Sequence, residues 1–297
     1  MTSTLLLPSW NDGDARRRII AVIDAMTDPE SGSYVEPDRR IATFDNDGTL
    51  WCEKPMYVQF MLLLTRWQQM AAADPSLREQ QPYKAAVEGD HAWFADLYEN
   101  ITDLLRGAGE AFAGITPDEF DTAVRTFFDT ARHPRFGVPL HHLTYVPMVE
   151  LLHLLSESGF KVLITTGGGR DFVRVVSQEL YGLPREAIIG SSPTLEYRDG
   201  NLYRTARLSG QIDDGPGKPV HIYERTGYTP ALAGGNADGD IQMLQTAQFG
   251  LLVRHDDEQR EYTYDAGSEK ALSLAGQAGW LVVSMKDDFA TIFATDT

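Results

Sequence analysis

The sequence predicts an α/β protein with a parallel sheet that is interrupted early by a helical insertion. Over most of the 297 residues, short apolar runs alternate with segments of helical periodicity, a pattern typical of parallel sheets. From about residue 56 to residue 142, helical segments follow one another without a convincing strand. We therefore assign residues 1–55 and 143–297 to an α/β core and residues 56–142 to a helical cap inserted into that core.

The first elements lead to a polar loop. Residues 14–26 have helical periodicity, and Asp14 is a candidate N-cap. The apolar run 41–44 is typical of a buried strand, and it ends in the polar run 45–49 (DNDGT). Open α/β sheets bind ligands at the carboxyl ends of their strands, so we expect this loop to lie at a ligand site.

The inserted segment is predicted to be helical. Apolar residues recur at helical spacing over 57–73, 92–105 and 120–128. Thr116 and Glu119 form a capping-box signature before the last of these helices. Because the segment directly follows the 45–49 loop, we expect it to act as a lid that influences substrate choice.

The second half of the core alternates helices and strands. Residues 145–158 and 171–181 are predicted helices, and residues 161–165 are a buried strand that leads into three glycines. Residues 194–208 alternate around Asp199-Gly200, which is a strong hairpin signal. Three further apolar runs are strand candidates: 231–233, 249–253 and 281–283.

Composition excludes several classes of function. With 26 Lys and Arg against 43 Asp and Glu, the formal net charge is −17, which argues against binding to a nucleic-acid backbone. The single Cys52 excludes an intramolecular disulfide and a cysteine-based zinc site. The apolar runs are too short to predict a membrane span, and no secretory pattern is recognised. We therefore expect a cytoplasmic protein without a membrane partner, and the sequence favours no particular oligomeric state.

Two carboxylates two residues apart, Asp45 and Asp47, dominate the first loop. One could attack a phosphorus centre while the other transfers a proton. Carboxylates this close repel each other, and a hard cation such as Mg²⁺ would relieve that repulsion. The alternative is an Asx-rich turn or a calcium loop. The preceding apolar strand, and the lack of a Glu at calcium-loop spacing, weaken that alternative.

Three further patches carry candidate chemistry. Thr166 with Gly167 and Gly168 could offer a hydroxyl and unobstructed backbone N–H groups to a phosphate. Lys218 lies in a Gly- and Pro-rich loop, where a lone lysine is usually a solvated surface charge. The loop 236–240 (NADGD) supplies amide and carboxylate oxygens that suit a metal site.

In order and spacing, these patches resemble the haloacid dehalogenase superfamily, and in particular its phosphoserine-phosphatase-like phosphatases. The motifs are FDNDGTL, VLITTGG, Lys218 and GGNADGDIQML. The resemblance covers about residues 41–55 and 145–260, with the helical segment in the place of the family's first-position cap. It implies a Rossmann-like core of the haloacid dehalogenase type.

The resemblance also implies roles for single residues. Asp45 corresponds to the nucleophile and Asp47 to the general acid/base, which dehalogenases of the superfamily lack. Thr166, Gly167 and Gly168 correspond to the phosphate-binding loop, and Lys218 to the family's lysine. Mg²⁺ is expected at Asp45, Asp47, Asn236 and Asp240. The alternative is that Asp238 is the ligand and Asn236 only shapes the turn.

Residues 51–56 join the core to the insertion. Glu53 and Lys54 are therefore expected to face the site and bind the substrate, with solvated hinge charges as the alternative. Glu53 could hold an amine of the substrate, and Trp51 or Tyr57 could stack on a cation.

Other polar residues receive structural interpretations. Cys52 is expected to pack in the core, and His141-His142 to form a polar turn between insertion and core. Residues 255–257 and 260–262 (HDD and REY) are expected to form a solvated loop that begins a charged helix. A supporting role behind the site is the alternative for this segment.

The function predicted from these observations is a Mg²⁺-dependent phosphatase. It would hydrolyse a small phosphorylated metabolite, a phosphomonoester, through an aspartyl-phosphate intermediate. Two alternatives are a phosphotransferase or phosphomutase of the same superfamily, and a catalytically silent binding module.

Overall fold

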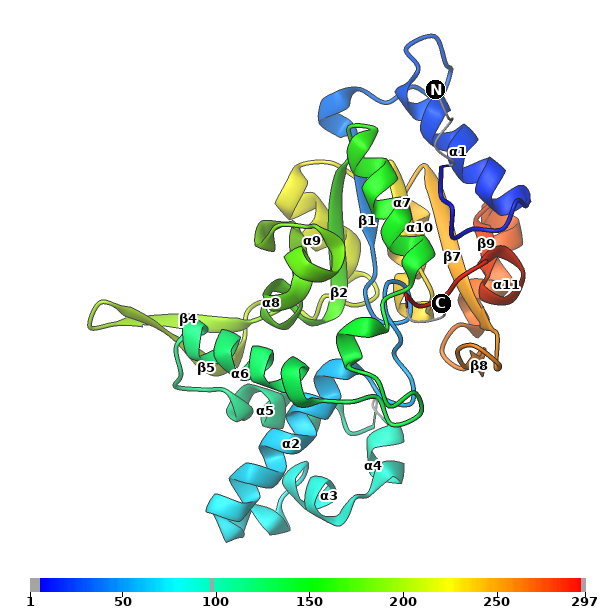
Figure 1. The fold of residues 1–297 in the computed structure, drawn as a ribbon. Helices are drawn as coiled ribbons and strands as arrows, with labels where there is room; N and C mark the ends of the chain where they lie inside the picture. Colours follow the sequence, from blue (N-terminus) through cyan, green and yellow to red (C-terminus); the bar gives the residue numbers. More distant parts are fainter. Residues whose placement is uncertain (1–5, 97–98, 295–297) are drawn as a thin grey trace. The chain divides into compact units, whose positions relative to one another are not determined.

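The computed structural model describes residues 6–96 and 99–294 and contains two compact units. The sheet unit comprises Met1–Lys54, Arg132–Gly190 and Ile212–Thr297. The helical unit comprises Pro55–Ala131 and Ser191–Gln211. Figure 1 shows the elements of both units, coloured along the sequence.

A seven-stranded sheet forms the centre of the sheet unit, in the order β3-β2-β1-β6-β7-β8, with β9 also paired to β7. β1 is parallel to β2 and β6, and β7 is parallel to β6 and β9, whereas β8 is antiparallel to β7. The predicted α/β class with a parallel sheet is therefore confirmed. The strands are β1 (Ile41–Phe44), β2 (Lys161–Gly169), β3 (Ile188–Ser191), β6 (Leu232–Gly235), β7 (Phe249–Asp256), β8 (Thr263–Tyr264) and β9 (Leu281–Ser284).

β1 lies between β2 and β6 and is buried along its whole length. Phe44 is in register with Ile164 of β2 and with Gly234 of β6. A Cβ atom at Gly234 would lie 2.4 Å from Cδ1 of Phe44, so only glycine leaves room for the ring. Because β1 is parallel to both neighbours, the carboxyl ends of β2, β1 and β6 lie at the same edge of the sheet.

The helices of the sheet unit follow the predicted pattern, with apolar residues of α7 and α8 buried. α8 ends at Gly182, which adopts a left-handed conformation as a C-cap. The N-cap of α1 is Gly13 rather than Asp14, which is the first helical residue. These helices are α1 (Asp14–Thr27), α7 (Val146–Glu157), α8 (Arg170–Tyr181), α9 (Gly217–Thr226), α10 (Ile241–Thr246), α11 (Glu269–Ala278) and α12 (Met285–Asp288).

Short 3₁₀ turns connect the elements of the sheet unit. One of them contains His141-His142, in agreement with the expected polar turn. The turns are η1 (Pro37–Arg39), η3 (Leu140–His142), η4 (Arg185–Ala187) and η5 (Asp238–Asp240).

The helical unit consists of α2 (Val58–Ala73), η2 (Pro75–Glu79), α3 (Tyr83–Glu88), α4 (His91–Ala95), α5 (Ile101–Ala111), α6 (Pro117–Thr130) and one β-hairpin. The indole of Trp67 is fully buried, donates a hydrogen bond to the carbonyl of Gly107 and stacks on Phe94. The capping box of Thr116 and Glu119 is present at the start of α6. Among the described residues, no helix has both the length and the apolar character needed to cross a membrane.

The helix expected over 92–105 is two helices, and this prediction was wrong in its continuity. α4 ends at Ala95 and α5 begins at Ile101, while residues 97–98 lie outside the described residues. The carboxylate of Asp96 accepts a hydrogen bond from the backbone N–H of Glu99. A side-chain hydrogen bond of this kind competes with helical hydrogen bonding.

The hairpin of β4 (Pro193–Arg198) and β5 (Asn201–Leu208) turns at Asp199 and Gly200, whose φ angles are 50° and 87°. It belongs to the helical unit, although its sequence position falls in the predicted core. The backbone of Arg204 pairs with Gly114 and Ile115, and its guanidinium lies 3.8 Å from the ring centroid of Phe120. These long-range contacts have no local sequence signal.

The two units therefore divide the chain differently from the predicted boundaries. Residues 191–211 belong to the helical unit, and residues 132–142 belong to the sheet unit. The second difference also depends on long-range contacts, because Nε2 of His133 lies 2.6 Å from the carbonyl oxygen of Lys54 and the ring of Phe136 packs on Phe293.

A matched pair of glycine substitutions tests the packing of the hairpin on α5. A Cβ atom at Gly109 would lie 2.2 Å from the carbonyl oxygen of Ala206, whereas Gly276 in α11 has no neighbour within 4 Å. Gly109→Ala is expected to lower the free energy of unfolding by about 1–3 kcal/mol through overpacking. Gly276→Ala is expected to raise it by up to about 1 kcal/mol, because alanine favours helix.

Urea unfolding followed by circular dichroism measures both changes. A stabilising effect of Gly109→Ala would contradict the close approach of β5 to α5.

Candidate active site

Three polar segments meet at the carboxyl edge of the sheet. Asp45 follows β1, Thr166 lies in the last half of β2, and Asn236 follows β6. The backbone N–H of Asp45 donates to the carbonyl of Gly234, which ties the first loop to the end of β6. Strand adjacency therefore brings together residues that are up to 191 positions apart.

Lys218 joins all three of these segments. It lies in the first turn of α9 and is only 2% exposed, so it is not the solvated charge that is usual for a loop lysine. Its Nζ donates to Oδ1 of Asp45 at 2.5 Å, to Oδ1 of Asp240 at 2.7 Å and to the carbonyl of Thr165 at 3.0 Å. Burial lowers the pKa of Lys218, but the two carboxylates outweigh this effect and hold the pKa above its ordinary value. The ammonium is therefore charged and compensates two buried carboxylates.

The first loop is a tight turn. The carbonyl of Asn46 accepts hydrogen bonds from the backbone N–H groups of Leu50 and Trp51, and the N–H of Gly48 donates to the carbonyl of Trp51. Gly48 has a φ of 77°, and a Cβ atom there would lie 2.1 Å from Nδ2 of Asn236. Glycine is therefore required at this position both for its conformation and for the close approach of the 236–240 loop.

Asp47 has a perturbed pKa. The pKa of the Asp47 carboxyl is raised to about 6, mainly by burial. The indole of Trp51 donates a hydrogen bond to Oδ1 at 2.8 Å, which lowers this pKa, whereas the negative charge of Glu53 raises it further. Burial also raises the pKa of Asp45, and Lys218 opposes that shift. Trp51 is 2% exposed, so it holds Asp47 rather than presenting a ring for a cation to stack on.

The 236–240 loop uses its three polar side chains differently. Oδ2 of Asp240 accepts from the backbone N–H groups of Asn236 and Ala237, both at 3.0 Å, while its Oδ1 faces Lys218. The amide oxygen of Asn236 accepts from the hydroxyl of Thr49 at 2.9 Å. Asp238 instead accepts from the backbone N–H of Ala271.

Oxygen atoms at this edge suit a hard cation. Among residues 6–96 and 99–294, no group of three or more His, Cys, Asp or Glu side chains could hold a metal. However, the carboxylate of Asp45, the main-chain carbonyl of Asp47 and the amide oxygen of Asn236 follow adjacent strands. A set of few oxygen donors fits Mg²⁺, which usually retains several waters.

The predicted phosphate-binding residues continue β2 rather than forming a separate loop. The strand extends through Gly169, and α8 begins at Arg170. The hydroxyl of Thr166 accepts a hydrogen bond from the backbone N–H of Gly168 at 3.0 Å. Thr166 is buried, while Gly167 and Gly168 are partly exposed.

Glu53 and Lys54 form one cluster with Tyr264. Glu53 is 5% exposed, and its Oε1 accepts from the Tyr264 hydroxyl at 2.7 Å. Nζ of Lys54 lies 3.4 Å from the same oxygen and 4.3 Å from the centroid of the Tyr264 ring. A Cβ atom on Gly48 would lie 3.0 Å from Cδ of Glu53, so the cluster lies against the first loop.

The expectation of a solvated loop and charged helix at 255–262 was wrong. β7 continues through Asp256, so His255 is buried in the sheet, and Glu261 is also buried. After the continuously buried run 249–253, Arg254 is exposed and His255 is buried, so the end of β7 alternates as a strand does. That alternation was the available sequence signal. Cys52 is buried as expected, and burial raises the pKa of its thiol.

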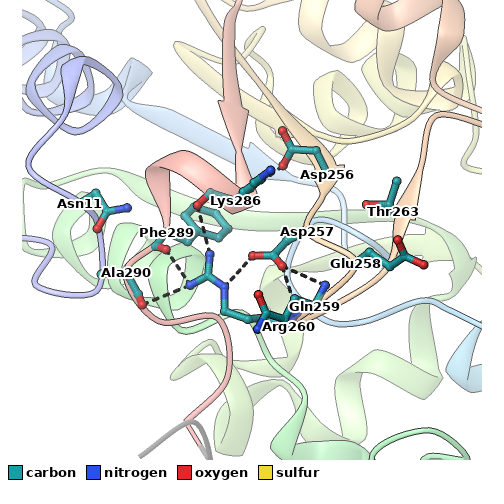
Figure 2. Close-up of a pocket in the computed structure, with 10 residues that line it drawn as sticks. All are labelled: Asn11, Asp256, Asp257, Glu258, Gln259, Arg260, Thr263, Lys286, Phe289 and Ala290. Carbon is teal, nitrogen blue, oxygen red and sulfur yellow. Dashed lines mark hydrogen bonds and ion pairs between the residues drawn. The ribbon is translucent and has the colours of Figure 1, made fainter.

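A polar cavity of about 650 Å³ lies beside this segment (Figure 2). Its lining includes none of the predicted site residues. Arg260, which dominates the view, donates to the carboxylate of Asp257 and to the carbonyls of Met285, Lys286, Phe289 and Ala290. Its guanidinium therefore fastens the C-terminal segment to the sheet unit rather than facing a ligand.

Comparisons with known proteins identify the family of the chain. The family model of haloacid dehalogenase-like hydrolases matches residues 42–245. The chain matches none of the curated proteins with significant similarity.

Two solved structures with TM-scores above 0.5 share the fold, and a third is similar at a lower score. A conserved protein of unknown function from Anaerococcus prevotii has a TM-score of 0.62 and 13% identity, and the match covers 97% of this chain and 98% of that one. A protein of unknown function from Bordetella pertussis has a TM-score of 0.56 and 17% identity, over 82% and 98% of the two chains. A phosphoserine phosphohydrolase-like protein from Francisella tularensis has a TM-score of 0.45 and 16% identity, over 82% and 94%. Because the family model spans more than half of the sequence, the chain belongs to the haloacid dehalogenase-like hydrolase family.

Proposed function

We propose that the protein is a Mg²⁺-dependent phosphatase that hydrolyses a small phosphomonoester. The observation that carries the proposal is the buried Lys218, which bonds to Asp45 and Asp240 at the edge where Asp47 also lies. The proposed nucleophile (Asp45), the proposed acid (Asp47) and a fixed positive charge (Lys218) therefore lie at the same edge of the sheet.

In the first step, the Asp45 carboxylate attacks phosphorus, and the bond to the leaving oxygen breaks as the aspartyl-phosphate forms. Asp47 in its acid form protonates the leaving oxygen. Lys218 and the backbone N–H groups near Thr166 stabilise negative charge on the phosphoryl oxygens. In the second step, Asp47 takes a proton from water, the water oxygen bonds to phosphorus, and the Asp45 carboxylate is released.

Asp45, the main-chain carbonyl of Asp47 and Asn236 would hold the metal. When bound, Mg²⁺ neutralises charge between the nucleophile and the phosphate. Asp240 accepts three hydrogen bonds, from Lys218 and from two backbone N–H groups, whereas the amide oxygen of Asn236 accepts one from Thr49 and retains a lone pair. We therefore assign Asp240 to anchoring Lys218 and the 236–240 loop, and not to the direct ligation expected from the sequence.

Glu53 and Lys54 are proposed to bind the part of the substrate beyond the phosphate. Glu53 is buried beside the first loop and contributes to the raised pKa of Asp47. A carboxylate in this position suits a substrate that carries an amine or another hydrogen-bond donor.

Asp45→Asn tests the covalent mechanism. Turnover of a phosphomonoester panel with Mg²⁺ is expected to fall by a factor on the order of 1,000 or more, because an amide is a poor nucleophile. The wild type should form a beryllium-fluoride adduct that Asp45→Asn lacks, detected by native mass spectrometry. Asp24→Asn, at an exposed position of α1, is the matched control.

Substantial activity in Asp45→Asn would refute the assignment of the nucleophile. Product analysis with an added alcohol distinguishes hydrolysis from phosphoryl transfer, because only hydrolysis releases all of the phosphate as inorganic phosphate.

A pair of variants tests Asp47 as the acid through opposite pH shifts. Asp47 must be protonated to donate, so kcat/KM for an alkyl phosphate should fall as the pH rises through its pKa of about 6. Trp51→Phe removes a hydrogen bond that lowers this pKa, so the alkaline limb should move to higher pH. Glu53→Gln removes a negative charge that raises it, so the limb should move to lower pH.

Both profiles use the same substrate, so ionisation of the substrate cancels in the comparison. Shifts in the same direction, or no shift in either variant, would count against Asp47 as the proton donor.

Asn236→Asp tests the metal assignment. The added charge should tighten Mg²⁺ binding several-fold without abolishing activity. Asp238→Ala should leave Mg²⁺ affinity unchanged, because Asp238 bonds to Ala271. Calorimetric titration with Mg²⁺ measures both, and loss of affinity in Asp238→Ala alone would reverse the assignment.

A further inference from the structure

We propose that His255 and Glu261 form a buried pair that positions the Asp45–Asp47 loop by holding the carbonyl of Gly48. The inference rests on the proposed phosphatase function, in which this loop supplies the nucleophile and the acid. His255 touches no reacting atom and acts through Gly48, so it is a positioning residue.

The contact to the loop has a defined direction. Nε2 of His255 lies 2.8 Å from the carbonyl oxygen of Gly48, and because a carbonyl only accepts, Nε2 carries the proton. The imidazole is 3% exposed and stacks on the ring of Tyr264, with centroids 4.4 Å apart and an interplanar angle of 22°. The ring therefore has little freedom to turn away from Gly48.

Glu261 orients the other side of the ring. Its Oε2 lies 3.1 Å from Nδ1 of His255 and accepts from the backbone N–H of Tyr262, while Oε1 accepts from the Tyr145 hydroxyl and the Cys52 thiol. Burial raises the pKa of Glu261, but the hydrogen bond and charge of His255 outweigh it, and the pKa lies below its ordinary value. The Glu261 carboxylate therefore holds the imidazole in the orientation in which Nε2 faces the carbonyl of Gly48.

The turn needs this support. Gly48 is buried and has a left-handed φ, so an unpaired carbonyl there would be costly and its peptide would be free to rotate. Asp47 precedes this residue, and Thr49, which holds the amide oxygen of Asn236, follows it. Rotation of the peptide after Gly48 would therefore disturb both the acid and the 236–240 loop.

The pair is itself held rigidly. His255 is in register with Tyr264 of β8, and the backbone N–H of Glu261 donates to the carbonyl of Asp257. Arg260 lies between Asp257 and Glu261 in the sequence. Its guanidinium bonds to the carboxylate of Asp257 and to carbonyls of the C-terminal segment (Figure 2). The turn that carries Glu261 is therefore tied to the C-terminal segment through Asp257 and Arg260.

A misplaced acid affects substrates unequally. An alkyl phosphate has a basic leaving oxygen that must be protonated, whereas p-nitrophenyl phosphate releases an anion that is stable without a proton. Loss of a positioning residue for Asp47 should therefore harm the alkyl substrate more. General loss of folded protein would harm both equally.

The test compares His255→Ala and His255→Gln with the wild type on both substrates. For His255→Ala, kcat/KM should fall roughly 10- to 100-fold for the alkyl phosphate, and only a few-fold for the aryl phosphate. His255→Gln should recover part of the loss, because its amide N–H can still donate toward Gly48. His153→Ala, at an exposed position of α7, is the control. Equal losses on the two substrates would overturn the proposal.

A second readout does not depend on activity. Backbone hydrogen exchange of a peptide covering residues 46–51 should be faster in His255→Ala than in the wild type, and unchanged in His153→Ala. Glu261→Gln, which retains the shape of the side chain, should show a smaller change in the same direction. Unchanged exchange in both His255→Ala and Glu261→Gln would overturn the proposal. Inactivity of the wild type on every phosphomonoester would refute only the phosphatase function.

Discussion

The site depends on one buried lysine that compensates two buried carboxylates. Without Lys218, Asp45 and Asp240 would be like charges removed from water at the ends of adjacent strands, which is strongly unfavourable. With it, Asp45 is held at the edge of β1, and Asp240 can turn its second oxygen to the backbone of the 236–240 loop. The placement of α9 is thereby coupled to the chemistry, because its first turn delivers the ammonium.

The parts of the fold that depend on local patterns could be predicted from the sequence. The runs 41–44 and 249–253 are strands because each is apolar and bounded by polar residues, and Asp199-Gly200 forms its hairpin through left-handed backbone angles. The membership of residues 191–211 in the helical unit could not be predicted, since it depends on contacts of Arg204 with residues about 90 positions away. Local periodicity carries no information on such distant contacts.

The site, like the fold, could be predicted from the sequence only in part. Convergence of Asp45, Thr166 and Asn236 was expected from the resemblance to the haloacid dehalogenase superfamily, and it arises in the structure because β1 lies between β2 and β6. The roles within the 236–240 loop were not predictable, because spacing alone does not tell which oxygens of Asp238 and Asp240 already have partners. A supporting role for His255 was only the alternative to a solvated loop, because its burial depends in part on β8, a strand of two residues without a sequence signal of its own.

The balance of buried charge gives a physical reason for a divalent cation. Glu261 has His255 beside it and Glu53 has Lys54 beside it, but Asp45 and Asp240 share the single charge of Lys218. This cluster therefore carries one net negative charge, within a chain whose formal charge is −17. A phosphate dianion is repelled by such a site, and screening over about 8 Å removes only the long-range part of that repulsion. A divalent cation adds two positive charges and makes the net charge of this cluster positive, whereas one further lysine would only bring it to zero.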